Sequence, residues 1–125
     1  MDSSTTTPFD PRTLEEQCKA REDQVRLVSL LVDDLRRHST DLIAAVSNGD
    51  GTAAARAAHS IAGAGALVAS VSVFDSAKNL ERRIKAGEVT SVSDHAETLG
   101  SLVMVLVDAL EGWKTDPSPV TAAAN

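Results

Sequence analysis

The sequence predicts an all-α protein: an antiparallel four-helix bundle with a short additional helix at its N-terminus. Apolar residues make up 42% of the 125 residues but aromatic residues only 2%, so the core must consist of aliphatic side chains. Within long segments the apolar residues recur at intervals of three and four, as they do along one face of a helix. No segment keeps the strict alternation that is typical of a half-buried strand.

The length of the chain favours one domain with a single core. Residues 1–8 are rich in serine and threonine, and we expect them to be flexible. The bundle is expected over residues 9–114. Residues 115–125 contain two prolines and a tail of small residues, so they are expected to be disordered.

The first two helices are predicted from a cap and from a periodic apolar stripe. Asp10 followed by Pro11 is typical of an N-cap and a first helical residue, which predicts a short helix through about Ala20. A longer helix is predicted over residues 23–47. Its apolar positions are Val28, Leu31, Val32, Leu35, Leu42, Ala45 and Val46.

A turn and a third helix follow. Residues 48–51, Asn-Gly-Asp-Gly, form a stop signal, because both glycines tolerate left-handed backbone and Asp50 or Thr52 can cap the next helix. The third helix is predicted over residues 52–69. Two glycines at positions 63 and 65 interrupt it at a cost of about 1 kcal/mol each relative to alanine, which indicates close approach of another group.

The fourth and fifth helices are predicted over residues 72–86 and 92–113, with Gly87 ending the fourth. The apolar stripe of the fourth helix consists of Val73, Ala77, Leu80 and Ile84. That of the fifth consists of Val92, Ala96, Leu99, Val103, Leu106, Leu110 and Trp113, at alternating spacings of four and three. This spacing is typical of a bundle helix.

Composition excludes several classes of protein. A formal net charge of −6 argues against nucleic-acid binding through phosphate contacts. Cys18 is the only cysteine, so there is no internal disulfide, and no His/Cys cluster has zinc spacing. The longest apolar run, residues 102–107, is too short to span a membrane, and the polar start lacks the pattern of a signal peptide. We therefore expect a cytoplasmic protein without a metal or membrane anchor.

One histidine, His59, lies in a stretch of small residues. Its neighbours at one helical turn are Ala55, Arg56, Ala62 and Gly63, and at two turns Thr52 and Ala66. The apolar residues Ala54, Ala57, Ala58, Ile61 and Val68 fall on the opposite side of the same helix. The imidazole is therefore expected to project from a low, open surface that another protein can reach.

This pattern resembles the histidine-containing phosphotransfer (HPt) domains of two-component phosphorelays. The matching residues are Ala58, His59, Ile61, Gly63, Ala64 and Gly65, then Leu80-Glu81 and Gly87, with Asn48-Gly49-Asp50 as the preceding turn. The resemblance covers about residues 9–113. Four positions depart from the family pattern: Ala62 stands where the family has a lysine, Ala64 and Gly65 where it has small hydroxyl residues, and Ala69 where it has its later glycine.

The resemblance implies a phosphocarrier in which His59 takes a phosphoryl group from one receiver-domain aspartate and passes it to another. It implies receiver domains of response regulators or a hybrid histidine kinase as partners. It also implies that Mg²⁺ belongs to the receiver, so the carrier needs no cofactor. No nucleotide-binding segment of useful spacing is present, so autokinase activity is not expected. A monomer is expected.

Other cations can replace the one missing at Ala62. Arg56 precedes His59 by three residues and shares its face. The fourth helix carries a basic edge of Lys78, Arg82 and Lys85. We hypothesise that Arg56 and one of these residues supply the charge, and that Glu81 orients the ring. Gly63 and Gly65, lacking Cβ atoms, are expected to let a partner's phosphoaspartate come close.

Two other functions remain open. The chain can be an HPt-like adaptor that docks a receiver or kinase domain without carrying phosphate, which the alanine at position 62 favours. It can also be a purely structural helical adaptor, or a dimeric bundle, whose histidine is incidental. His38, His95 and Cys18 are expected to have no chemical role.

Overall fold

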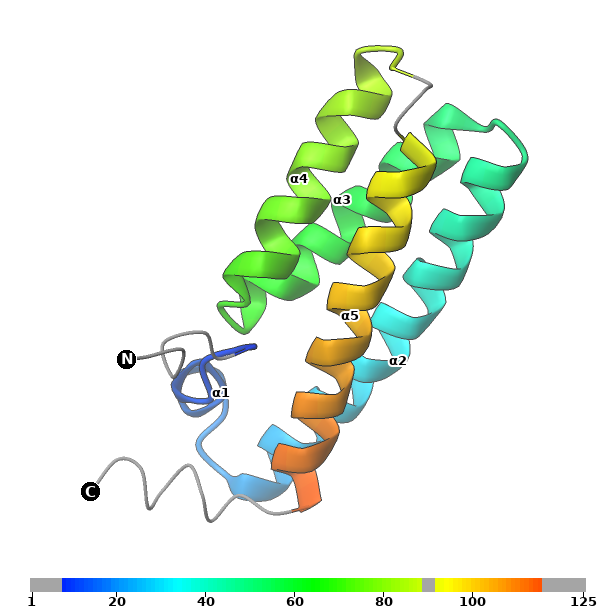
Figure 1. Cartoon of the computed structure of the whole chain (residues 1–125). Helices are drawn as coiled ribbons and strands as arrows, with labels where there is room; N and C mark the ends of the chain where they lie inside the picture. The colour runs from blue at the N-terminus through cyan, green and yellow to red at the C-terminus, as the bar shows by residue number, and fades with distance from the viewer. Residues whose placement is uncertain (1–7, 89–91, 116–125) are drawn as a thin grey trace.

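The computed structural model describes residues 8–88 and 92–115, and this part of the chain is helical without strands (Figure 1). Its helices are α1 (Arg12–Gln17), α2 (Arg21–Ser47), α3 (Gly51–Leu67), α4 (Val71–Lys85) and α5 (Val92–Thr115). The predicted flexibility of the start and disorder of the tail fall mainly on residues 1–7 and 116–125, which lie outside the described residues.

The four long helices form the predicted antiparallel bundle (Figure 1). α2 and α4 each contact both α3 and α5, so α3 and α5 lie diagonally opposite. The core between them is aliphatic, as the composition predicts. Its largest fully buried side chains are Leu14, Leu35, Leu42, Ile61, Leu80, Leu99, Leu106, Leu110, Val28, Val32, Val68 and Val73.

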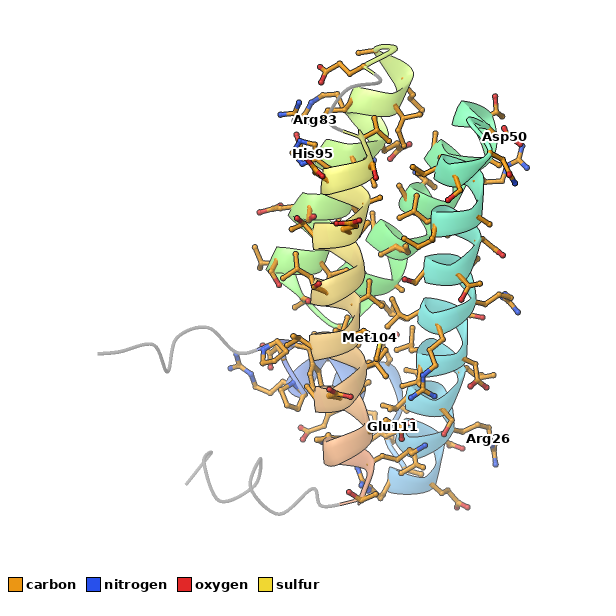
Figure 2. All side chains as sticks on the ribbon, turned by 45° about the vertical axis from the view of Figure 1, so that its right-hand side comes forward. Arg26, Asp50, Arg83, His95, Met104 and Glu111 are labelled. Atoms are coloured by element: carbon orange, nitrogen blue, oxygen red, sulfur yellow. The ribbon has the colours of Figure 1, made fainter. Side chains whose placement is uncertain are left out.

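The turns that reverse the chain use the predicted residues. Gly49 has φ +70° and Gly87 has φ +79°, a left-handed backbone that favours glycine. The Asp50 side chain accepts a hydrogen bond from the Ala53 N–H at 3.1 Å and so caps α3 at one end of the bundle (Figure 2). Of the two predicted caps, Asp50 rather than Thr52 makes this bond.

The first helix is shorter than predicted, because it ends at Gln17 and Cys18 adopts an extended backbone that leads to α2. It begins at Arg12 with Pro11 as its N-cap residue, one position later than predicted, and the Asp10 side chain accepts a hydrogen bond from the Arg12 N–H at 3.0 Å. The backbone N–H of Asp10 donates to the Val68 carbonyl at 2.8 Å, and fully buried Leu14 packs into the core. The N-terminal segment is therefore attached to the end of α3 (Figure 1).

The other predicted boundaries differ from the structure by one or two residues. The second and fifth helices extend beyond the predictions to Arg21 and Thr115, so the predicted tail begins inside a helix. The third was predicted to reach Ala69 but ends at Leu67, because Ala69 has φ +56°. The backbone N–H of Ser70 then donates to the Gly65 carbonyl at 2.8 Å, which closes a Schellman turn.

Replacing Ala69 with glycine is expected to stabilise the fold by about 0.5 to 1 kcal/mol, because an L-residue pays a steric cost in the left-handed region that glycine avoids. The measurement is urea unfolding followed by circular dichroism. As a control, Ala44→Gly at an exposed position within α2 should lower stability by about 1 kcal/mol. A loss of stability in both variants would contradict the assignment.

Candidate functional site

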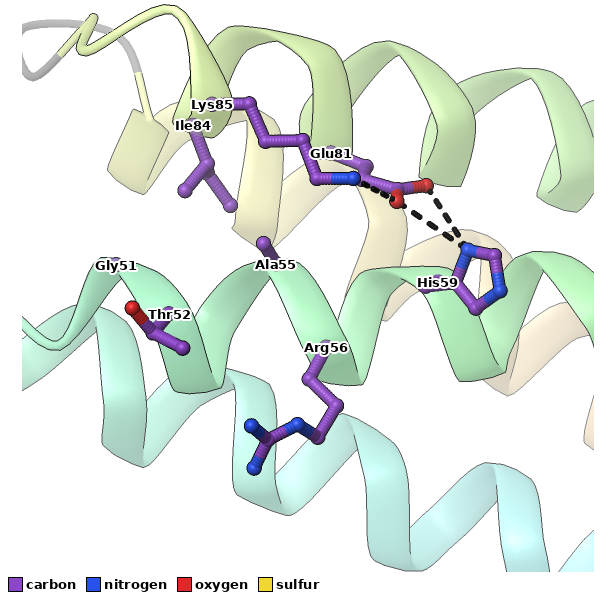
Figure 3. Close-up of a pocket in the computed structure, with 8 residues that line it drawn as sticks. All are labelled: Gly51, Thr52, Ala55, Arg56, His59, Glu81, Ile84 and Lys85. Atoms are coloured by element: carbon purple, nitrogen blue, oxygen red, sulfur yellow. Dashed lines mark hydrogen bonds and ion pairs between the residues drawn. The ribbon is translucent and has the colours of Figure 1, made fainter.

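The His59 side chain projects from the middle of α3 and is 68% exposed. It lies at the end of a groove of about 600 Å³ between α3 and α4 (Figure 3). The groove is lined by Gly51, Thr52, Ala55, Arg56, His59, Glu81, Ile84 and Lys85. Because the ring stands at the open surface, a second protein can reach it.

The ring is held on one side by a carboxylate from the neighbouring helix. His59 Nδ1 lies 3.2 Å from Glu81 Oε2 and 3.4 Å from Oε1 (Figure 3). Lys78 Nζ donates to Oε1 at 3.0 Å, and Lys85 Nζ donates to Oε2 at 2.9 Å. The Glu81 side chain is only 7% exposed, so these contacts supply the partners that a buried carboxylate needs.

The network determines the state of Glu81 and the tautomer of His59. The hydrogen bond from Lys85 lowers the pKa of Glu81 most; burial opposes this, and the bonds from Lys78 and His59 lower it further, to about 2. The carboxylate is therefore ionised near neutral pH and can only accept hydrogen bonds. Nδ1 of His59 must then carry the hydrogen, which leaves the Nε2 lone pair of the neutral ring free.

This lowered pKa predicts how stability depends on pH. Since the folded pKa of Glu81, about 2, lies below its ordinary value of 4.5, the ionised group stabilises the fold above pH 4.5. That contribution, about 2 kcal/mol, should disappear as the pH falls toward 2. The measurement is urea unfolding between pH 5.5 and 2.5, where Glu81→Gln should lose less stability than the unmodified protein. Equal losses would contradict the prediction.

The candidate cations are not equivalent in the structure. Lys78 and Lys85 reach Glu81 and so lie beside the ring. The Arg56 side chain instead extends toward α2, away from the ring (Figure 3). Arg82 is exposed and donates to Asn79 Oδ1 at 2.9 Å. The structure therefore brings together two of the four candidates.

Two alanines expected on the open side of α3 are buried. Ala55 and Ala62 were predicted to lie with His59 on a low, open surface, yet both are buried. The reason is that α3 packs against both α2 and α4, so its buried sector is wider than one apolar stripe. The residues predicted for the opposite side, Ala54, Ala57, Ala58, Ile61 and Val68, are buried as expected.

The two glycines of α3 have different surroundings. A Cβ atom at Gly63 would meet nothing within 4 Å, so this position leaves open space beside the ring. A Cβ at Gly65 would lie 3.0 Å from Val73 Cγ1 and 3.2 Å from the Phe74 backbone nitrogen. The prediction that Gly65 gives a partner access is therefore wrong: its missing side chain lets α3 and α4 pack closely.

The sequence interpretation missed an apolar patch formed by Leu67, Val71 and Phe74, all of them exposed. Leu67 follows His59 by eight residues and so shares its face of α3, while Val71 and Phe74 begin α4. The available signal was that Val71 and Phe74 lie off the apolar stripe of α4. The patch extends the surface beside His59 toward the turn between α3 and α4.

The histidines without a predicted role lie elsewhere. His38 is half-buried and lines a groove of about 400 Å³ between α2 and α3. His95 is half-buried on the first turns of α5 (Figure 2). Within residues 8–88 and 92–115, no group of three or more His, Cys, Asp or Glu side chains could hold a metal ion. None of the described helices is long and apolar enough to cross a membrane.

Comparison with known protein families identifies a family for most of the chain. The family model described as the Hpt domain matches residues 26–114, which include α3, α4 and most of α2 and α5. Searches of curated proteins and of solved structures found no match.

Proposed function

Because the chain belongs to the Hpt domain family, whose members act in histidine phosphotransfer in phosphorelays, we propose that it relays a phosphoryl group between receiver-domain aspartates through His59. The observation that supports this most is the state of the ring. Its Nδ1 is held by a buried carboxylate, and its Nε2 faces solvent on an exposed side chain. An orienting acceptor on one nitrogen and a free lone pair on the other are what a nucleophilic imidazole needs.

In the proposed reaction, the Nε2 lone pair attacks the phosphorus of an aspartyl phosphate. The N–P bond forms as the acyl O–P bond breaks, and the aspartate leaves as a carboxylate. The ring then carries a positive charge, which the ionised Glu81 stabilises through the Nδ1 hydrogen bond. Attack by a second receiver's aspartate on the same phosphorus reverses these steps. In this proposal the receiver supplies Mg²⁺, and the carrier supplies position and charge.

A second candidate is an adaptor that docks a receiver or kinase domain without carrying phosphate. The alanine at position 62 favours it, because the family pattern has a lysine there. A structural helical adaptor with an incidental histidine is a third candidate. The contact between His59 and ionised Glu81 favours the carrier over both, because neither alternative needs an oriented ring.

Incubation with a ³²P-phosphorylated receiver domain separates the three functions. The carrier should acquire label that is labile in acid and stable in alkali, and His59→Gln should abolish it. His38→Gln and His95→Gln are matched controls that should keep it. Receiver binding without label would support the adaptor and contradict the carrier. The absence of both binding and label would support the structural role.

The apolar patch predicts where the receiver docks. Val71 is 68% exposed, and burying a carboxylate there against an apolar partner is costly. Val71→Asp should therefore raise the KM for the phosphorylated receiver about tenfold. Val105→Asp on α5 is the matched control, because Val105 is 54% exposed and α5 lies diagonally opposite α3. Transfer kinetics at several receiver concentrations make the measurement. An equal effect of both substitutions would contradict this docking surface.

A further inference from the structure

Two lysines hold the Glu81 carboxylate from opposite directions along α4. Lys78 lies one helical turn before Glu81 and donates to Oε1, whereas Lys85 lies one turn after it and donates to Oε2. The Lys78 side chain is 42% exposed and the Lys85 side chain 65%. The two ammonium groups share one carboxylate but lie on different sides of it.

The antiparallel packing of α3 and α4 decides what each lysine lies beside. Gly51 at the start of α3 lies against the last turn of α4, and Gly65 near its end lies against the first turn. The last turn of α4 also carries Lys85, which lines the groove beside the start of α3. Lys78 comes earlier in α4 and therefore lies toward the C-terminal half of α3.

The free nitrogen of the ring lies toward the C-terminal half of α3, the half beside which Lys78 comes on α4. Nε2 of His59 is on the side of the ring turned away from Lys85 (Figure 3). A phosphoryl group on Nε2 brings roughly 1.5 to 2 negative charges close to the Glu81 carboxylate. Like charges so close repel each other, and a cation between them removes the repulsion.

We propose that Lys78 is the residue that binds the phosphoryl group on His59, and that Lys85 keeps Glu81 in position. This rests on the proposed function, because it needs a phosphorylated His59. Lys78 Nζ turns from Glu81 toward a phosphoryl oxygen, while Lys85 and the ring Nδ1 keep their contacts with the carboxylate. Lys78 thus supplies from α4 the positive charge that Ala62 cannot supply from α3.

The test uses phosphoramidate as a small phosphodonor, so it does not depend on a receiver domain. Nε2 attacks the phosphorus, the P–N bond of phosphoramidate breaks, and its nitrogen takes a proton and leaves as ammonia. ³¹P NMR then follows the titration of the phosphoryl group on the full chain. The variants are Lys78→Gln, Lys78→Arg, Lys85→Gln and, as an exposed control on the same helix, Arg82→Gln.

In Lys78→Gln the titration midpoint should rise by about half a pH unit or more, because a bound cation favours the dianion. Lys78→Arg should restore it, Arg82→Gln should leave it unchanged, and Lys85→Gln should raise it less. A rise in Lys85→Gln equal to or above that in Lys78→Gln, or none in either variant, would overturn the proposal. Failure of His59 to accept phosphate would overturn both proposals. If the titration midpoints shifted as expected but a phosphorylated receiver domain transferred no phosphate to His59, only the relay would be contradicted.

Discussion

Replacing Glu81 with glutamine is expected to slow phosphoryl transfer to His59 by about ten- to a hundredfold, with little change in the fold. The amide can still accept a hydrogen bond from Nδ1, but it carries no charge to stabilise the ring once phosphorus is bound. It also presents an N–H₂ group, which can donate to Nδ1 and so favour the wrong tautomer. Single-turnover transfer from a phosphorylated receiver makes the measurement.

A matched substitution separates this effect from a general loss of charge. Glu97 is exposed on α5, so Glu97→Gln removes the same charge far from the ring and should leave the transfer rate unchanged. ¹⁵N NMR of the imidazole should show one tautomer in the unmodified protein and a mixture in Glu81→Gln. If Glu81→Gln had the same transfer rate and the same tautomer as the unmodified protein, Glu81 would not orient the ring.

Replacing Gly65 with alanine is expected to lower the free energy of unfolding by about 1 to 3 kcal/mol. The added Cβ would lie 3.2 Å from the Phe74 backbone nitrogen and 3.0 Å from Val73 Cγ1, so α3 and α4 must move apart. Their spacing also sets the contact between His59 and Glu81. Transfer should therefore decline together with stability, as urea unfolding and transfer assays on the same variant can show.

Gly63 provides the control for this substitution. Alanine at position 63 meets no atom within 4 Å, and it should stabilise the helix by about 1 kcal/mol because alanine has the higher helix propensity. Both variants add one methyl group to the same helix, two residues apart. A Gly65→Ala protein as stable as Gly63→Ala would show that the helices do not need this close approach.

Helix number and order could be predicted from the sequence because apolar periodicity is a local property of each segment. The ends were less certain, because they depend on single backbone conformations. Ala69 illustrates this: an alanine in the sequence does not indicate a left-handed φ, which the turn into α4 imposes. Asp50, whose side chain bonds three residues ahead, could be predicted because its capping is local.

The sequence assigned the candidate residues to particular helices, but it did not determine which of them make contact. Periodicity assigns Arg56 and the three basic residues of α4 to particular faces of their helices. It does not set the level along their axes at which α3 and α4 meet. That level brings Lys78 and Lys85 to Glu81, and it buries Ala62 between helices. The role of Gly65 depends on the same packing distance, which no single helix reveals.

In the proposed relay, His59 presents Nε2 as the atom that accepts phosphate, while Glu81 holds Nδ1. Heteronuclear ³¹P–¹⁵N NMR of the phosphorylated chain, with ¹⁵N-labelled histidine, identifies the bonded nitrogen directly. The structure predicts a single phosphorus coupled to Nε2 of His59, with Nδ1 protonated. Phosphorus on Nδ1, or on another histidine, would contradict the account.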